Sequence, residues 1–190
     1  LGWSHGDDEI FSRAQFLEWF NLDHLGRSAA QFDEAKLRWV NAQHLKAMDD
    51  ALLAPLVAAQ LEKRGIAVDE RLPRICALFK DRCDTTVALA NWAAAFYADI
   101  TPNPEEHAQH VTDAVRPALL ALAEKLALCA WERPAIAAAI KEVLVAQGLK
   151  MPQLAMPVRV LVMGTAQTPS LDAVLELQKK QTILERLQKA

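Results

Sequence analysis

The chain carries few of the sequence signals that β-structure requires. Its 190 residues include only six glycines, and no Asn-Gly dipeptide stands between alternating apolar runs, the pattern typical of a tight β-hairpin. Alanine, leucine, glutamate, lysine and glutamine, which are strong helix formers, dominate instead. The sequence therefore predicts an all-α, multihelical fold.

Residues typical of helix starts and stops divide the chain into segments. Ser12 and Gln15 have the spacing of a capping box, and Asp33 can cap the helix that follows. Asn103 followed by Pro104 and two acids predicts a start in the middle of the chain. Pro117 is expected to interrupt the segment that follows. Other predicted starts are Asp50 or Ala54-Pro55, Asp84, Pro134 and Thr168-Pro169, and the predicted stops are Gly65 and Gly148.

The segment from Pro157 to Gly164 is ambiguous by pattern alone. Val158, Val160 and Val162 alternate as in a strand, whereas a proline before the run and a glycine after it are typical of helix ends. A lone strand would have no partner, so we expect a helix of about two turns beginning at Pro157. A last helix is expected from Thr168-Pro169 through Leu187.

Composition bounds the class of protein without naming a partner. A hydrophobic content of 52% can bury a real core, and a net charge of -3 does not by itself indicate nucleic acid. Three cysteines without a CxxC pair predict neither disulfides nor zinc, which fits a cytoplasmic protein. The longest uncharged run, 85–98, is too short to span a membrane. Because Leu1 is not methionine, we expect an excised fragment.

Candidate catalytic and metal-binding patterns are weak. His24-Leu25-Gly26-Arg27 resembles the HIGH signature of class I synthetases, but the preceding residues do not predict the strand that this signature requires. His107 and His110 have helical spacing for metal ligands, yet no further ligand pattern accompanies them. We therefore predict no catalytic residue and no metal site in this chain.

Two groups of basic residues could contact phosphates. Each is interleaved with acids, and such charges usually form the solvated face of a helix, so the groups alone do not decide between the two interpretations. The residues are Arg71, Arg74, Lys80 and Arg82 in the first group and Lys179, Lys180, Arg186 and Lys189 in the second.

Several short motifs, in order along the whole chain, resemble the carboxyl-terminal part of bacterial glutamyl-tRNA synthetases. They are Leu1-Gly2-Trp3-Ser4, Lys36-Leu37-Arg38-Trp39-Val40-Asn41, Pro157-Val158-Arg159 with Gly164, and Thr168-Pro169-Ser170-Leu171. The resemblance implies the end of a stem-contact fold at 1–46 and two helical anticodon-binding subdomains at 47–94 and 95–190. It also implies that a separate Rossmann part binds ATP and magnesium and forms glutamyl-adenylate, so no cofactor is expected here.

The same resemblance implies which residues read the anticodon. Arg82 resembles the arginine that reads the first base and is associated with rejecting glutamine tRNA, and Arg159 resembles the second reading arginine. Thr168, Pro169 and Leu171 resemble the residues that hold the remaining bases. A guanidinium group suits this task because its rigid fork of donors can stack on a base or bond its edge. Without the resemblance, the residues alone favour a simpler interpretation, with Arg82 as a helix-end cation and Arg159 as a surface side chain.

Departures from the family pattern leave some details open. Leu161 and Met163 replace an alanine and a threonine and make that helix more hydrophobic. Leu177-Gln178-Lys179 stands where the family often has Leu-Leu-Gly, so the last two helices could be continuous. The expected partner is tRNA(Glu), bound by a monomer without membrane contact. A helical protein-interaction module remains the alternative, and an independent enzyme is a third, weaker one.

Overall fold

The computed structural model describes residues 2–23, 25–26, 29 and 31–190 and confirms the all-α prediction. Within these residues there are eleven α-helices and one 3-10 helix, and the one β-bridge joins His5 to Asp8. The helices are α1 (Arg13–Trp19), α2 (Glu34–Ala47), α3 (Asp50–Glu62), α4 (Leu72–Phe79), η1 (Lys80–Arg82), α5 (Thr86–Ala94), α6 (Pro104–His110), α7 (Arg116–Leu128), α8 (Arg133–Gln147), α9 (Met151–Met163), α10 (Leu171–Leu177) and α11 (Lys180–Gln188).

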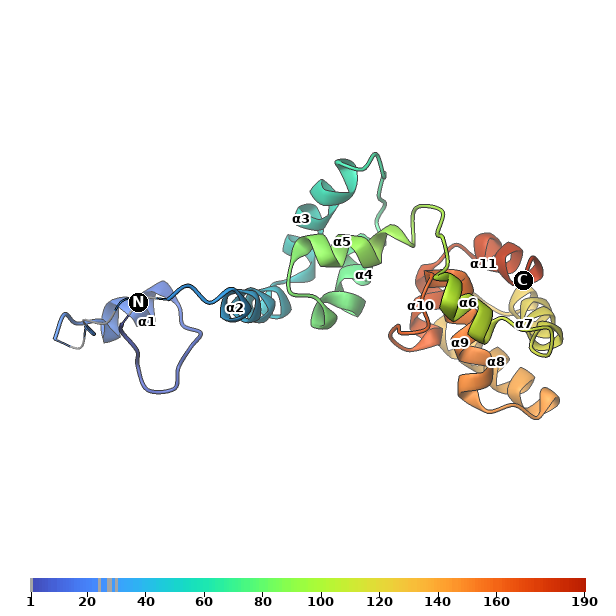
Figure 1. The fold of residues 1–190 in the computed structure, drawn as a ribbon. Helices are drawn as coiled ribbons and strands as arrows, with labels where there is room; N and C mark the ends of the chain where they lie inside the picture. The colour runs from blue at the N-terminus through green and yellow to red at the C-terminus, as the bar shows by residue number, and fades with distance from the viewer. Residues whose placement is uncertain (1, 24, 27–28, 30) are drawn as a thin grey trace.

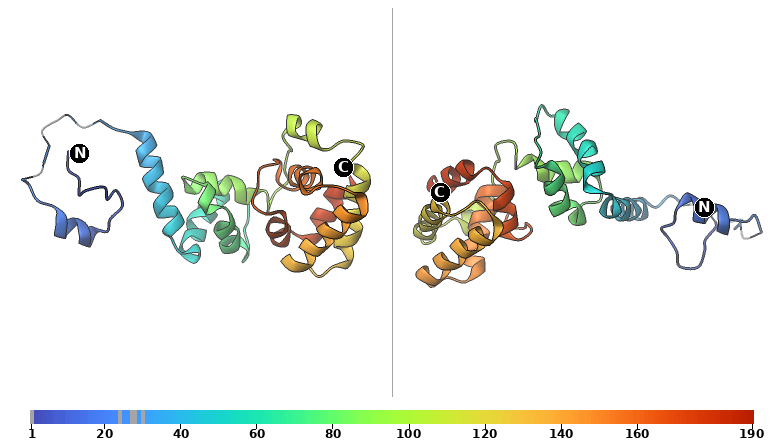
Figure 2. Two further views of the ribbon diagram at one scale, coloured as in Figure 1. Left: turned by 90° about the horizontal axis from the view of Figure 1, so that it is seen from below. Right: turned by 180° about the vertical axis from the view of Figure 1, so that it is seen from behind.

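These helices form an elongated molecule with three parts in a row (Figures 1 and 2). A loop-rich segment with α1 lies at one end and continues into the single helix α2. The first helical group, α3 to α5 with η1, occupies the middle, and the second helical group, α6 to α11, occupies the other end. The subdomain boundaries at residues 46 and 94 stay predictions.

The two helical groups have different cores. In the first group, α3 packs against α4 and α5 around the buried side chains of Leu53, Leu61 and Ile75, and the Phe79 and Trp92 rings stack with centroids 5.2 Å apart. The second group is larger, and α7 packs there against α8 and α11. Its largest fully buried side chains are Leu119, Leu122, Leu126, Ile136, Leu154, Leu175 and Ile183.

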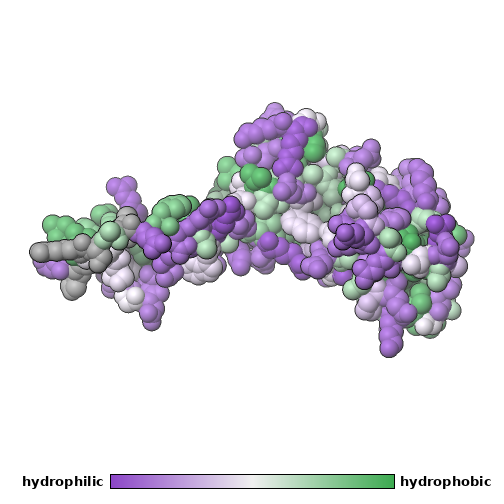
Figure 3. All heavy atoms as spheres, viewed as in Figure 1, coloured by the Kyte–Doolittle hydropathy of each residue, from purple (hydrophilic) through white to green (hydrophobic). Residues whose placement is uncertain are grey.

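The amino-terminal part has little buried core. Trp3, Phe16 and Phe20 form a small aromatic cluster with Phe11, and Leu45 is the one buried residue of α2. Many hydrophobic side chains stay exposed along this segment and α2 (Figure 3). They include Leu17, Leu22, Phe32 and Leu37. Leu1, of the Leu1–Ser4 motif, and His24 and Arg27, of the pattern that resembles HIGH, lie outside the described residues.

Most predicted helix ends are confirmed by local geometry. Ser12 and Gln15 form both hydrogen bonds of the capping box, and the Asn103 side chain accepts from the amides of Glu105 and Glu106. Gly148 and Gly164 end α8 and α9 with φ angles of 62° and 81°, in the left-handed region that a residue without Cβ adopts readily.

Three further predictions have different outcomes: the cap at Asp84 is wrong by one residue, the start at Asp50 is confirmed, and the interruption at Pro117 is wrong. Helix α5 is capped by Thr85, because the Asp84 carboxylate pairs with Arg38 on α2. Helix α3 begins at Asp50 with Asp49 as its cap, so the alternative start at Ala54-Pro55 lies inside the helix. Pro117 belongs to the first turn of α7, where its missing amide costs no helical hydrogen bond, and it therefore begins a helix.

The predicted start at Pro157 is wrong. Helix α9 begins six residues earlier at Met151, with Pro152 in its first turn, and Pro157 lies in its interior. A proline there removes one backbone hydrogen bond, but extensive burial of α9 compensates. Val158, Val160 and Val162 are all fully buried, so alternation carried no information about which side of the segment faces the core.

The last predicted helix is two helices. Thr168 and Pro169 precede α10, which begins at Leu171, and the chain breaks at Gln178 and Lys179 before α11. The Gln178 side chain holds the break at this position. Its amide turns inward and donates to the backbone carbonyls of Ala95 and Val162. The continuous alternative is excluded.

Candidate nucleic-acid interface

Arg82 is the last residue of η1, which continues directly from α4 in the first helical group. Its side chain is exposed, and among the described residues it forms no hydrogen bond or ion pair. The turn that carries it is nevertheless held firmly. Lys80 Nζ donates to the Met48 carbonyl at 2.9 Å and pairs with Asp50 Oδ1 at 2.8 Å. The backbone around Arg82 is thus fixed to the junction of α2 and α3.

The residues after Arg82 are tied to α2 as well. Arg38 Nη1 pairs with Asp84 Oδ2 at 3.2 Å, and Asn41 Nδ2 donates to the Asp84 carbonyl oxygen. Cys83, which lies between Arg82 and Asp84 in the sequence, is buried. Two groups of bonds, one before and one after Arg82, therefore hold the turn and leave the guanidinium free to bind another molecule.

Arg159 lies on α9 in the second helical group and is half-buried. Its Nη2 donates to the Pro169 carbonyl at 3.3 Å, whereas its Nε is buried without a hydrogen-bond partner in the described part of the chain. Burial and the nearby positive charge of Arg82 lower the pKa of Arg159. The charge of Arg82 is therefore near enough to act on Arg159, and no carboxylate among the described residues pairs with either arginine. Such an arrangement favours a partner that supplies negative charge or hydrogen-bond acceptors.

The segment just before α10 is folded back onto Arg159. Thr168 is only 6% exposed, and its Oγ1 donates to the Pro169 carbonyl at 3.0 Å, so this oxygen accepts from both Thr168 and Arg159. Leu171 is 5% exposed at the start of α10. The structure therefore brings four of the five predicted site residues together, and Arg82 approaches them from the other helical group.

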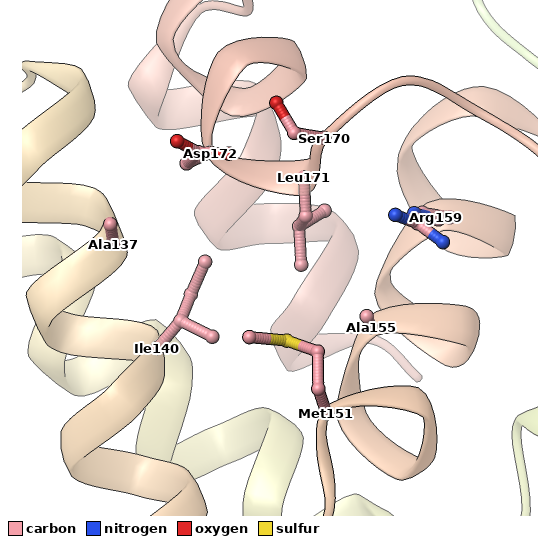
Figure 4. Close-up of a pocket in the computed structure, with 8 residues that line it drawn as sticks. All are labelled: Ala137, Ile140, Met151, Ala155, Arg159, Ser170, Leu171 and Asp172. Atoms are coloured by element: carbon pink, nitrogen blue, oxygen red, sulfur yellow. The ribbon is translucent and has the colours of Figure 1, made fainter.

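A hollow of about 290 Å³ lies between α8, α9 and the start of α10 (Figure 4). Its walls are mostly apolar, and Arg159, Ser170 and Asp172 lie at its edge. The lining residues are Ala137, Ile140, Met151, Ala155, Arg159, Ser170, Leu171 and Asp172. An apolar hollow with a few polar groups at the edge is suited to a flat, partly polar ligand.

The negative charge at this edge is already neutralised. Arg133 Nε donates to Asp172 Oδ2 at 2.6 Å, and Arg133 Nη2 donates to Ser170 Oγ at 3.2 Å. Burial opposes ionisation, but the hydrogen bonds from Arg133 and Ser170 outweigh it and lower the pKa of Asp172. Arg159 therefore remains the unneutralised charge of the hollow.

The other reactive side chains do not form a catalytic arrangement in the described part of the chain. Burial raises the pKa of Cys76 to about 12 and that of Cys83 to about 11, which leaves both as unreactive thiols at neutral pH. No group of three His, Cys, Asp or Glu side chains among the described residues could hold a metal ion. None of the helices described has both the length and the apolar character needed to cross a membrane.

The family follows from comparison with known proteins. A family model described as an anticodon binding domain matches residues 34–190. The chain belongs to this anticodon-binding family. The match includes both helical groups, and with them Arg82, Arg159 and the hollow beside α10.

The similar sequences and the similar structure all carry the name of one kind of enzyme. A glutamate–tRNA ligase of Albidiferax ferrireducens is 79% identical over 187 residues, and one of Verminephrobacter eiseniae is 72% identical over 195 residues, each match covering 98% of this chain. The chain spans 40% and 41% of the length of these two relatives. The whole chain also superposes on a crystal structure of a glutamate tRNA ligase from Elizabethkingia meningosepticum, and the match covers 38% of that protein's chain. The TM-score is 0.91 at 23% identity, which shows a shared fold.

Sequence reasoning missed the residues that support the site. Ala137 and Ile140 of α8 line the hollow, and Arg133 neutralises its edge, but apolar residues and a cation on a helix carry no local signal of such roles. In the sequence, the Lys36–Asn41 motif indicates only the family resemblance and gives no sign of its contacts. In the structure, Lys36 pairs with Glu9 at 2.8 Å while Arg38 and Asn41 hold Asp84, so this motif links the amino-terminal segment to the turn of Arg82.

Proposed function

We propose that this chain is the tRNA-recognition part of a glutamate–tRNA ligase and that its partner is tRNA(Glu). The observation that carries the proposal is the pair of unneutralised arginines, Arg82 and Arg159, beside an apolar hollow. The name shared by relatives up to 79% identical supports the same conclusion. Attachment of glutamate to tRNA, with ATP and magnesium, is assigned to the part of the ligase that this chain does not include.

The chemistry of the hollow suits an unpaired RNA base. Proteins read RNA sequence mainly where loop bases are splayed out, by supporting the face of the base and bonding its edge. Leu171, Ile140 and Met151 offer apolar contacts for the face. The guanidinium of Arg159 lies at the edge of the hollow and is only half-buried, so a carbonyl oxygen or ring nitrogen of a base could accept a hydrogen bond from it.

We assign the anticodon bases in the order that the resemblance implies. Arg82 reads the first base from its exposed position, Arg159 reads the second, and Thr168, Pro169 and Leu171 hold the remaining bases. Thr168 and Leu171 are buried in the free chain, so their part is to shape the site and to offer a small contact surface. The same proposal places the protein in the cytoplasm as a monomer, since one copy contains all five residues.

A fluorescence-anisotropy titration with an anticodon stem-loop RNA of tRNA(Glu) tests this function. We expect saturable binding that weakens as salt rises, because arginine contacts release counterions from the phosphates. The control is Arg116→Gln, since Arg116 is exposed, pairs with Asp113 at 3.3 Å and does not line the hollow. Absence of binding at low salt, or equal loss from Arg116→Gln and Arg159→Gln, would contradict the proposal. A helical protein-interaction module, the alternative, leaves the two unneutralised arginines without a role.

A further inference from the structure

The carboxyl end of α10 is fastened to the amino end of α4 by a half-buried arginine. We propose that Arg71 is a positioning residue whose bond to the Leu177 carbonyl sets the relative placement of the Arg82 turn and the Arg159 hollow. This inference rests on the proposed function for its consequence, but the latch itself can be measured without RNA. We call the Arg71, Asp69, Tyr97 and Leu177 group the latch.

The contacts of the latch leave Arg71 little freedom. Its Nη1 donates to the Leu177 carbonyl at 2.8 Å across 106 residues of sequence, while Nε and Nη2 both bond the Asp69 carboxylate, at 2.9 Å and 2.8 Å. The guanidinium also lies over the Tyr97 ring, 5.1 Å from its centroid, and Tyr97 Oη donates to Asp69 at 3.2 Å. The Arg71 side chain is 17% exposed. A planar guanidinium bonded to a carboxylate on one edge and to a backbone carbonyl on the other can fix the distance between the two segments that carry these groups.

The latch lies at the opposite ends of two short helices from the predicted readers. Arg71 caps the start of α4, and Arg82 follows the end of α4 through η1. Leu177 ends α10, and Leu171 begins it. Eight residues of helix span about 12 Å, so a tilt of roughly 5° at the latch moves a reader by roughly 1 Å. An error of that size is large for a hydrogen bond to a base edge.

A second, fully buried contact reinforces this placement. Gln178, directly after Leu177, is 4% exposed and donates to the carbonyls of Ala95, at the end of α5, and Val162, in α9. Arg186 of α11 donates to the same Val162 carbonyl at 3.0 Å. The break after α10 is therefore bonded to both helical groups at once, which is where their relative orientation is determined.

A neighbouring ion pair provides the matched control. Arg74 on α4 pairs with Glu176 on α10 at 2.7 Å, so it joins the same two helices as the latch. The Arg74 side chain is 63% exposed, however, and exposed pairs contribute little to stability or geometry. Replacing either arginine by glutamine removes one positive charge from the same helix, so only the burial and bonding of the lost group differ.

The first measurement uses no RNA. Spin labels are placed at the exposed residues Val87 and Leu128, one in each helical group, with Cys129→Ser to avoid labelling that thiol. Pulsed electron resonance then gives the distribution of label distances in the 190-residue chain. We expect Arg71→Gln to broaden this distribution and Arg74→Gln to leave it unchanged. If Arg71→Gln does not fold, Asp69→Asn with Arg71→Leu removes the latch without leaving a carboxylate unpaired.

The second measurement compares RNA discrimination in the same variants. The probe is the anticodon stem-loop of tRNA(Glu) and two versions with the first or the second anticodon base replaced. We expect Arg71→Gln to lower discrimination at both bases by about fivefold, the lower end of what one base contact provides, and Arg74→Gln to leave it unchanged. A merely stabilising role would lower the unfolding temperature without changing these ratios.

The outcomes separate the two proposals. An unchanged distance distribution in Arg71→Gln overturns the latch. A broadened distribution with unchanged discrimination overturns the positioning role and leaves the proposed function intact. If the unsubstituted chain does not discriminate among the RNAs, the proposed function fails and the positioning role fails with it, whatever the distances show. Broadening together with loss of discrimination at both bases supports the inference.

Discussion

The two arginines predicted to read the anticodon differ in how their side chains are held. Arg82 is exposed and unbonded on a turn that other residues hold in place, whereas Arg159 is half-buried, bonded to Pro169 and already partly desolvated. A partly desolvated guanidinium has lost some of its water before RNA arrives, so less water has to be displaced when it bonds to a base. An exposed donor must give up water first. Arg159 is therefore the more strongly preorganised reader, and Arg82 depends on the rigidity of its turn.

The largest loss of RNA affinity is expected from Arg159→Met. This change removes a half-buried cation that no carboxylate among the described residues neutralises, and it keeps a side chain of similar length, so the free energy of unfolding should not decrease. RNA affinity should fall by about 1–3 kcal/mol, the range for a specific base contact. Urea unfolding followed by tryptophan fluorescence and anisotropy with the cognate stem-loop measure the two quantities. A loss of stability without a loss of affinity would make Arg159 a structural residue.

A smaller effect, and no effect on stability, is expected from Arg82→Gln. The exposed guanidinium contributes about 1 kcal/mol to discrimination at the first base, near the lower limit for a base contact. Binding of stem-loops with the glutamate and glutamine anticodons should therefore become more alike, while the unfolding free energy changes by less than about 0.5 kcal/mol.

Lys63→Gln is the control for that experiment, since Lys63 is also an exposed cation of the first helical group. It should preserve the ratio of affinities for the two anticodons. An unchanged ratio in Arg82→Gln would remove Arg82 from the site and leave Arg159 as the sole reading arginine of the pair.

The contrast between the two arginines also shows what the sequence could predict. Local chemistry predicted the fold class and most helix ends, because capping side chains and left-handed glycines act on residues one to four positions away. Pro157 misled the prediction because extensive burial of α9 from Leu154 onward, a tertiary effect, keeps a proline inside the helix. Gln178 could not be recognised as a helix break, since the carbonyls that bind its amide belong to α5 and α9.

The site was predictable only in part for the same reason. Resemblance pointed to Arg82 and Arg159, whereas residue type and spacing alone left both as ordinary surface cations. The influence of the Arg82 charge on Arg159, 77 positions away in sequence, and the apolar wall from Ala137 and Ile140 both arise from tertiary packing. The roles of the five site residues in binding RNA stay predictions until variants are measured.

The smallest effect on RNA is expected from Lys80→Met, which loosens the turn of Arg82 without touching the hollow. Loss of the bonds to Met48 and Asp50 should lower the free energy of unfolding by about 1 kcal/mol, as for one buried hydrogen bond. Discrimination at the first base should fall roughly twofold, less than in Arg82→Gln, because the guanidinium remains but is less well placed. Discrimination at the second base should not change, because Arg159 is held by α9 and Pro169. Titration of stem-loops altered at one base or the other separates these effects, and equal losses at both bases would show that the two readers are not held independently.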